Sequence, residues 1–238
     1  MPEKRTEKSM KKYRRIFLRT VLILGTILLI LTGIRSWQDR RYNLISVMIA
    51  FLACFCVYLT YEKREGSIRR MVLLAVMVAI AVTGRFLFAP LPFFKPVTAI
   101  VILTGMYLGA EAGFLVGSLT ALISNIFFGQ GPWTPFQMLA WGTIGMAAGL
   151  PIVSNLLKKK WALILYGVFT GFLYSGIMDF WTVLSMEGGW NWSRYLAALA
   201  TALPVTVIYA VSNAIFLIMT WKPIGEKLNR IQKKHGIF

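Results

Sequence analysis

The feature that most constrains the fold of this chain is the recurrence, along its whole length, of apolar runs close to the length of a membrane-crossing helix. A helix needs about 20 predominantly apolar residues to cross the hydrocarbon of a bilayer. Hydrophobic residues make up 57% of the 238 residues, and charged residues only 15%. The sequence therefore predicts an all-α polytopic membrane protein. Its eight expected spans are residues 16–34, 43–61, 71–88, 96–109, 112–128, 135–156, 161–184 and 195–221.

The fourth and fifth expected spans are the closest pair, because only Gly109-Ala110-Glu111 separates them. We treat them as two helices, since the nearby glycines allow a tight turn and Glu111 suits a position near the surface. The two cysteines, Cys54 and Cys56, lie two residues apart in one apolar run. On a helix they point to different faces, so their spacing predicts neither a disulfide nor a metal site.

The formal net charge of +17 is of the sign expected for a nucleic-acid partner. Here, however, the basic residues lie in the tails and in short loops between apolar runs, which is the positive-inside pattern of membrane proteins. If the N-terminus is cytoplasmic, the expected inside segments hold 20 of the 26 lysines and arginines. The charge distribution therefore predicts a multi-pass protein of the cell membrane with both termini in the cytoplasm, in contact with the lipid bilayer and not with nucleic acid.

Composition divides the chain into two parts. Residues 1–64 comprise a basic tail and a transmembrane hairpin whose two spans are rich in Leu, Ile and Val. Residues 68–238 comprise six spans richer in Gly, Pro, Trp, Asn and Thr, followed by a basic C-terminal tail. Small and polar residues let membrane helices pack closely and bind ligands, so we expect the second part to be the substrate-binding domain.

A polar, turn-forming segment, GQGPWTP at 129–135, lies between two of the apolar runs. Unpaired backbone and amide groups cost several kcal/mol each in hydrocarbon, so this segment is expected at a membrane surface or beside a cavity. The expected topology places it outside, together with two further loops, 86–96 and 185–194, that are rich in aromatic residues and in Pro or Gly. An apolar pocket with a few directed polar groups is the usual form of a small-molecule site.

The candidate ligand contacts are aromatic, amide and charged side chains in or beside these loops: Arg85, Phe93, Lys95, Asn125, Gln130, Trp133, Gln137, Trp141, Asp179, Trp190 and Trp192. Other interpretations stay open for several of them. Tryptophans also collect at membrane interfaces without binding a ligand. Arg85 and Lys95 can extend to lipid headgroups instead. Asp179, inside a span, is expected to be paired or to line a wet cavity, and Arg85 is one possible partner.

The sequence carries no motif for catalysis. It has no GxxxxGK[ST] phosphate loop, no HExxH and no GxSxG, and its one histidine, His235, lies in the basic tail. We therefore expect a protein that is not an enzyme and that has no catalytic residues, cofactor or metal. If its action requires energy, the energy must come from a partner.

The third expected span carries Ala75 and Ala79, four residues apart. Small residues at this spacing form a flat stripe on which another helix can approach closely, either a helix of the same chain or one of a partner.

A six-helix unit with an AxxxA pair on its first helix resembles the substrate-specificity (S) component of energy-coupling factor (ECF) vitamin transporters. The segments GRFLFAP (84–90), FKPVTAI (94–100) and FFGQGPWTPFQMLAWG (127–142) are similar to the branch associated with cobalamin and related corrinoids. The resemblance covers about residues 68–222 and implies a six-helix S-component-like bundle, here preceded by an extra N-terminal transmembrane hairpin.

The resemblance further implies that the chain captures a vitamin at the outer face, with cobalamin or a related corrinoid favoured. Ala75 and Ala79 would contact a transmembrane coupling subunit, and the two ATPase subunits of the ECF module would drive a toppling motion that opens the site inward. Three alternatives stay open: an S component for another vitamin or a modified base, a self-sufficient secondary carrier with an Asp179–Arg85 relay, and a membrane scaffold whose outer loops bind a partner.

Overall fold

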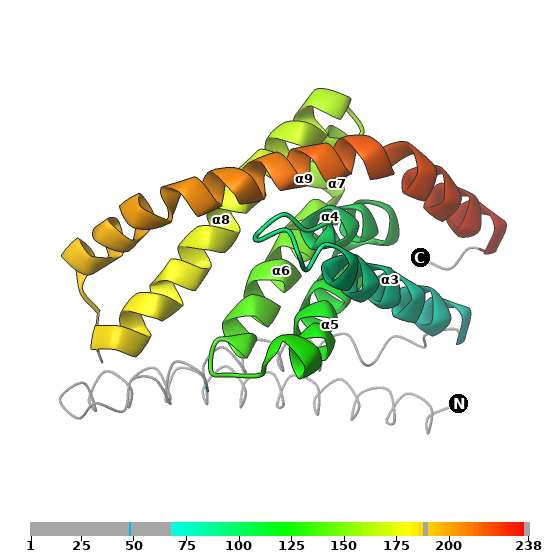
Figure 1. Ribbon diagram of the computed structural model, residues 1–238. Helices are drawn as coiled ribbons and strands as arrows, with labels where there is room; N and C mark the ends of the chain where they lie inside the picture. Colours follow the sequence, from blue (N-terminus) through cyan, green and yellow to red (C-terminus); the bar gives the residue numbers. More distant parts are fainter. Residues whose placement is uncertain (1–47, 49–67, 188–189, 236–238) are drawn as a thin grey trace, which may run out of the picture.

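The computed structural model describes residue 48 and residues 68–187 and 190–235, which are drawn in colour in Figure 1. The hairpin predicted within residues 1–64 lies outside the described residues, except for Met48. From residue 68 onward, the described part contains helices and no strands. These helices are α3 (Ile68–Leu87), α4 (Val97–Leu108), α5 (Ala110–Phe128), α6 (Thr134–Ala148), α7 (Pro151–Leu157), α8 (Lys160–Glu187) and α9 (Trp192–His235).

Each span expected after residue 68 corresponds to helical structure. Four helices, α3, α5, α8 and α9, are long and apolar enough to cross a membrane, and α6 with α7 forms a fifth candidate if the two count as one bent span. The helix α4 is apolar but has only 12 residues. The predicted all-α polytopic membrane architecture is therefore confirmed for the part of the chain that the structure describes.

The span expected at 135–156 is divided into two helices. The chain leaves α6 at Ala148 and enters α7 at Pro151, and the two helices are bent by 78° relative to each other. Proline has no N–H and its ring clashes with the preceding turn of a helix, so α6 cannot continue through Pro151 undisturbed. The same residue suits the first position of a new helix, where an N–H would have no intrahelical partner.

The last helix is longer than predicted. We expected a span at 195–221 followed by a basic tail, whereas α9 has 44 residues and continues to His235. The basic residues expected in the tail therefore belong to the last part of a helix: Lys222, Lys227, Arg230, Lys233 and Lys234.

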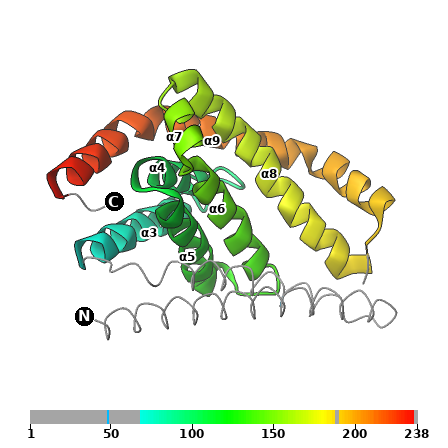
Figure 2. The same cartoon turned by 180° about the vertical axis from the view of Figure 1, so that it is seen from behind.

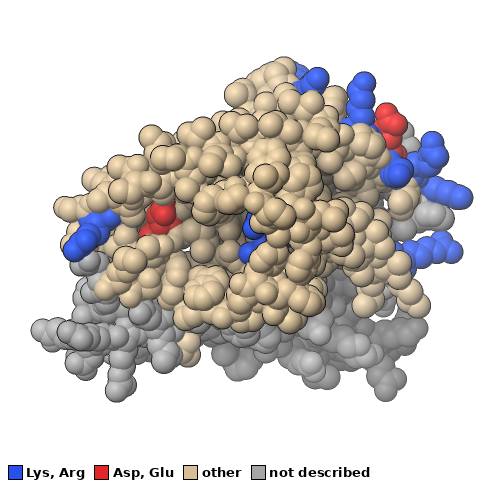
Figure 3. All heavy atoms as spheres, in the orientation of Figure 1, with Lys and Arg blue, Asp and Glu red and all other residues tan. Residues whose placement is uncertain are grey.

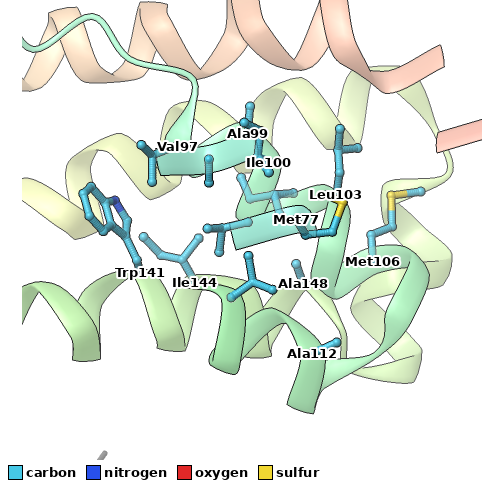
Figure 4. Close-up of a cluster of buried hydrophobic side chains, with 14 of the residues drawn as sticks. Met77, Val97, Ala99, Ile100, Leu103, Met106, Ala112, Trp141, Ile144 and Ala148 are labelled. Atoms are coloured by element: carbon cyan, nitrogen blue, oxygen red, sulfur yellow. The ribbon is translucent and has the colours of Figure 1, made fainter. Parts of the chain in front are cut away.

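The short helix α4 lies at the centre of the described part. All of its residues except Tyr107 are buried, and it contacts every other described helix. Figure 4 shows Val97 and Leu103 of α4 in one cluster with Met77 of α3 and Ile144 of α6. At 1.5 Å per residue α4 is about 18 Å long, short of the roughly 30 Å of bilayer hydrocarbon. Its neighbours shield it from lipid, so it does not have to span.

Glycines let α4, α5 and α6 approach to backbone contact. A Cβ on Gly113 of α5 would lie 2.8 Å from the Cα of Gly105 on α4 and would overlap the carbonyl of Gly145 on α6. Small residues at helix interfaces allow this close approach in membranes. The three helices therefore form a rigid group against which the rest of the structure packs.

The turn between α4 and α5 is the single residue Gly109, with φ 94°. Glycine adopts a positive φ without steric cost, because it has no Cβ. The predicted division into two helices at this point is confirmed. Glu111, in the first turn of α5, is buried within the protein. It forms an ion pair with Arg70 of α3, with 2.5 Å between the guanidinium nitrogen and the carboxylate oxygen.

Basic residues gather at one end of the described part. They lie at the start of α3, between α7 and α8, and in the last turns of α9, and Figure 3 shows most Lys and Arg atoms at this end. Figures 1 and 2 agree that the α5–α6 loop and the end of α8 lie on the side away from α7. The basic ends and the loops predicted to lie outside are therefore on different sides of the described part. The orientation of these sides in the membrane stays a prediction from the positive-inside rule.

Candidate ligand-binding site

A cavity of about 250 Å³ opens where the α3–α4 loop meets α6, α8 and α9. Its lining combines two cations, four aromatic rings and several polar groups. The lining residues are Arg85, Pro92, Phe93, Lys95, Val97, Thr98, Gln137, Trp141, Gly171, Tyr174, Tyr209 and Asn213. Ligand sites are commonly mostly apolar concavities of this kind with a few convergent polar groups.

Prolines shape the loop that forms one side of the cavity. Pro90 follows the end of α3, and Pro96 precedes α4, so neither helix extends into the loop. The loop is tied to α9 through Lys95, whose backbone N–H donates to Ser212 Oγ at 2.9 Å. Ser212 Oγ donates in return to the Lys95 carbonyl at 3.2 Å.

Phe93 in this loop adopts φ 61°. A bulky residue in the left-handed region is strained, and such residues concentrate at ligand sites. The conformation brings the Phe93 ring against Tyr209 of α9, edge to face, with 5.7 Å between the ring centres. The loop therefore contributes an aromatic side chain to the cavity at some cost in backbone strain.

An aromatic wall connects α6, α8 and α9. Trp141 of α6 stacks on Tyr174 of α8, with 5.2 Å between the ring centres and 16° between the planes. Tyr174 in turn meets Tyr209 of α9 edge to face at 5.1 Å. Figure 4 shows Trp141 beside Val97, at one end of the core cluster, so the wall continues directly from the packed interior. Flat side chains arranged in this way suit a flat apolar ligand.

A chain of polar side chains runs behind this wall. Arg85 Nη1 donates to Asn125 Oδ1 at 2.7 Å and also to Ser124 Oγ. Asn125 Nδ2 donates to Gln137 Oε1 at 2.7 Å, and Gln137 Nε2 donates to the Tyr174 hydroxyl at 3.1 Å. Because a guanidinium can only donate, each amide in the chain has its oxygen toward Arg85. Among the described residues the Tyr174 O–H proton has no acceptor, so it is available to a ligand.

Two cations face the cavity. Arg85 is buried, and its guanidinium lies 4.6 Å from the centre of the Phe128 ring and 5.3 Å from that of Trp141. The Lys95 ammonium lies 5.0 Å from the same Phe128 ring. Burial lowers the pKa of the Lys95 ammonium below its usual value, and the positive charge of Arg85 lowers it further. The ring faces attract both cations, but an aromatic ring carries no net charge that could neutralise them.

The structure gathers five of the sequence-predicted candidates at the cavity: Arg85, Phe93, Lys95, Gln137 and Trp141. Asn125 is buried one layer behind, where it holds Arg85 and Gln137 in place. Gln130 lies at the α5–α6 turn instead, and its side chain donates to the Leu122 carbonyl at 2.8 Å and accepts from Thr134 Oγ1 at 2.9 Å. Trp133, 39% exposed, is also absent from the lining.

The remaining candidates lie on α8, between α8 and α9, and at the start of α9, and they do not line the cavity. Trp190 and Trp192 form an aromatic cluster with Phe180 and Tyr195 where α8 and α9 meet. Asp179 accepts a hydrogen bond from Ser175 Oγ at 3.4 Å. The pairing of Asp179 with Arg85, left open from the sequence, is not formed, because Arg85 bonds to Ser124 and Asn125 instead. The secondary-carrier alternative thus loses the relay on which it depended.

Sequence reasoning missed Tyr174, Tyr209 and Asn213, all of which line the cavity. The available signal was a set of polar side chains in the middle of apolar spans, where each needs a partner. Asn213, for example, donates from Nδ2 to the Gly167 carbonyl at 3.0 Å across the α8–α9 interface.

The family model for the ECF-type riboflavin transporter, S component, matches residues 65–226. The chain belongs to this family. The predicted S component is therefore confirmed, whereas its corrinoid branch is not, because the matching family is described by riboflavin. No curated protein and no solved structure matches the chain.

Membership also fixes the broad class of activity. S components are membrane-embedded, vitamin-binding subunits of transporters, in agreement with the prediction of a multi-pass membrane protein that is not an enzyme. The matched segment begins three residues before α3 and ends within α9, so it contains the whole lining of the cavity. Within this S component the cavity is the candidate vitamin site.

The hydrogen-bonded side chains behind the cavity give a first prediction, which concerns stability. Asn125→Leu should lower the free energy of unfolding by about 2–4 kcal/mol, because the buried Arg85 guanidinium and the Gln137 carbonyl each lose a partner. Chemical denaturation of the purified chain in detergent measures the change.

The matched control is Asn155→Leu on α7, where an exposed asparagine accepts from Lys158 Nζ at 2.7 Å. The same substitution there should change stability by about 0.5 kcal/mol or less. Equal stability of the two variants would show that the hydrogen bonds that connect the side chains of Arg85, Asn125, Gln137 and Tyr174 do not support the site structurally.

Proposed function

We propose that the chain is the substrate-binding subunit of an ECF-type importer and that its ligand is riboflavin, bound in the cavity between the α3–α4 loop and helices α6, α8 and α9. The observation that carries this proposal is the stacked pair Trp141–Tyr174 with the hydrogen-bonded chain behind it. A tricyclic flavin ring offers a flat apolar face for the aromatic side chains and polar edge atoms for the directed donors. The description of the family supports the same ligand.

Cavity size favours riboflavin over the corrinoid suggested by the sequence. A volume of about 250 Å³ lies just below the usual range of roughly 300–1,000 Å³ for small-molecule sites. A corrinoid macrocycle with its amide side chains is several times larger than a flavin, so enclosing it would require the α3–α4 loop to move away from α9. That movement would break both hydrogen bonds between Lys95 and Ser212.

The expected coupling surface is the exposed side of α3, which faces away from the other described helices. Ala75 and Ala79 are both exposed, and their exposed neighbours Val72, Val76 and Ile80 are also apolar. A transmembrane coupling subunit could therefore pack closely on this stripe. In this proposal two ATPase subunits of the ECF module supply the energy, both termini are cytoplasmic, and the cavity loads from the outer side before the chain topples.

Direct titration tests the substrate. The full chain, purified in detergent and freed of bound ligand, is expected to bind riboflavin with one-to-one stoichiometry and to quench its fluorescence, while cyanocobalamin gives no saturable signal. Trp141→Ala should weaken riboflavin binding by about tenfold or more, because it removes the stacking surface.

Trp161→Ala is the control, since Trp161 is 59% exposed at the start of α8 and lies outside the cavity. It should leave the dissociation constant unchanged. Saturable binding of cyanocobalamin without any binding of riboflavin would overturn the flavin proposal and favour the corrinoid.

Co-purification tests the coupling surface. The double variant Ala75→Leu/Ala79→Leu should lose association with the co-expressed coupling subunit, because two larger side chains prevent the close approach of a partner helix. Riboflavin binding by the isolated variant should persist. The control is the double variant Ala197→Leu/Ala200→Leu, which changes two exposed alanines of α9 instead. This control should retain the complex. Retention of the coupling subunit by the α3 variant would exclude this stripe as the interface.

A further inference from the structure

The cavity has more positive charge than the described side chains around it balance. Arg85 is only 8% exposed, and Lys95 is partly buried beside it. A guanidinium remains charged in any protein environment, so Arg85 cannot escape the cost of burial by losing its proton. A buried charge is expensive unless it is paired and hydrogen-bonded.

Of the carboxylates whose side chains the structure describes, none compensates these cations. Glu111 pairs with Arg70 at the other end of α3, and Asp179 is bonded to Ser175 on α8. Glu226 is the remaining acid whose side chain the structure describes, and it lies in the basic final third of α9. The protein groups bonded to Arg85 are the neutral oxygens of Ser124 and Asn125.

The free hydrogen-bonding groups at this end of the cavity are donors. Arg85 uses Nη1 for its two protein bonds, and within the described part of the chain its Nη2 and Nε protons have no acceptor. The Lys95 ammonium contacts a ring face and has no oxygen partner there. The Tyr174 hydroxyl accepts from Gln137 and keeps its own proton. An ionised acid, which only accepts hydrogen bonds, is complementary to this set.

We propose that the Arg85–Lys95 end of the cavity binds an anionic group of the ligand, a carboxylate or a phosphate, and that the protein therefore prefers an acidic vitamin form over its neutral counterpart. The inference rests on the proposed function, because it concerns the same cavity, but it does not depend on the ligand being a flavin. A bound anion neutralises two cations that otherwise repel each other. Charge-assisted hydrogen bonds are also stronger than neutral ones.

Two matched pairs of probes test the preference. Riboflavin 5′-phosphate differs from riboflavin by one phosphate, and nicotinate differs from nicotinamide by a carboxylate in place of an amide. With the full purified chain, riboflavin 5′-phosphate should bind about tenfold or more tightly than riboflavin. Nicotinate should raise the melting temperature more than nicotinamide at equal concentration. The first pair reports on phosphate and the second on carboxylate, independently of the flavin ring.

Lys95→Gln removes the positive charge that the α3–α4 loop contributes to the cavity and leaves the charge of Arg85 on α3. In this variant the ratio of the two flavin dissociation constants should fall toward one, and so should the difference between nicotinate and nicotinamide. Lys160→Gln, at an exposed lysine at the start of α8, is the matched control and should keep the preference of the unaltered chain.

The outcomes separate the inference from the proposed function. Riboflavin binding with no preference for its phosphate, and none for nicotinate, overturns the inference and leaves the function standing. A nicotinate preference that Lys95→Gln removes, without binding of either flavin, supports the inference and overturns riboflavin as the ligand. Absence of any response to all four probes overturns both.

Discussion

The structure depends on one buried contact, the hydrogen bond from the Arg85 guanidinium to Asn125. This contact joins the end of α3 to α5, and through Gln137 and Tyr174 it extends to α6 and α8. A charge at this depth requires oxygen partners, so the position of Arg85 determines the orientation of both amides. The same guanidinium borders the cavity, and the groups that support it therefore also define the donors offered to a ligand.

A rigid support keeps these groups in position. The backbones of α4, α5 and α6 touch at Gly105, Gly113 and Gly145, and α4 is enclosed by all the other described helices. The α3–α4 loop, by contrast, is held to α9 by two hydrogen bonds at Ser212 and contains the strained Phe93. We expect ligand entry to involve this loop, because all the other residues that line the cavity lie on helices.

The sequence predicted most of the fold, because apolar length and charge asymmetry are strong signals in membrane proteins. Arg85, Lys95 and Trp141 were found because they lie next to Pro- and Gly-rich interruptions of apolar runs. Tyr174 and Tyr209 were missed, since a tyrosine inside a span gives no indication of which helix it faces. The bend at Pro151 had a local signal, but its 78° angle depends on packing that a single sequence does not encode.

The central claim is that the cavity at Trp141 and Arg85 is the vitamin site of this S component. A structure of the full chain determined with riboflavin tests it most directly. We expect ligand density against the Trp141–Tyr174 stack, with a polar edge of the ligand toward Arg85 and Lys95. Density instead at the Trp190–Trp192 cluster between α8 and α9, with the cavity at Arg85 empty, would contradict it.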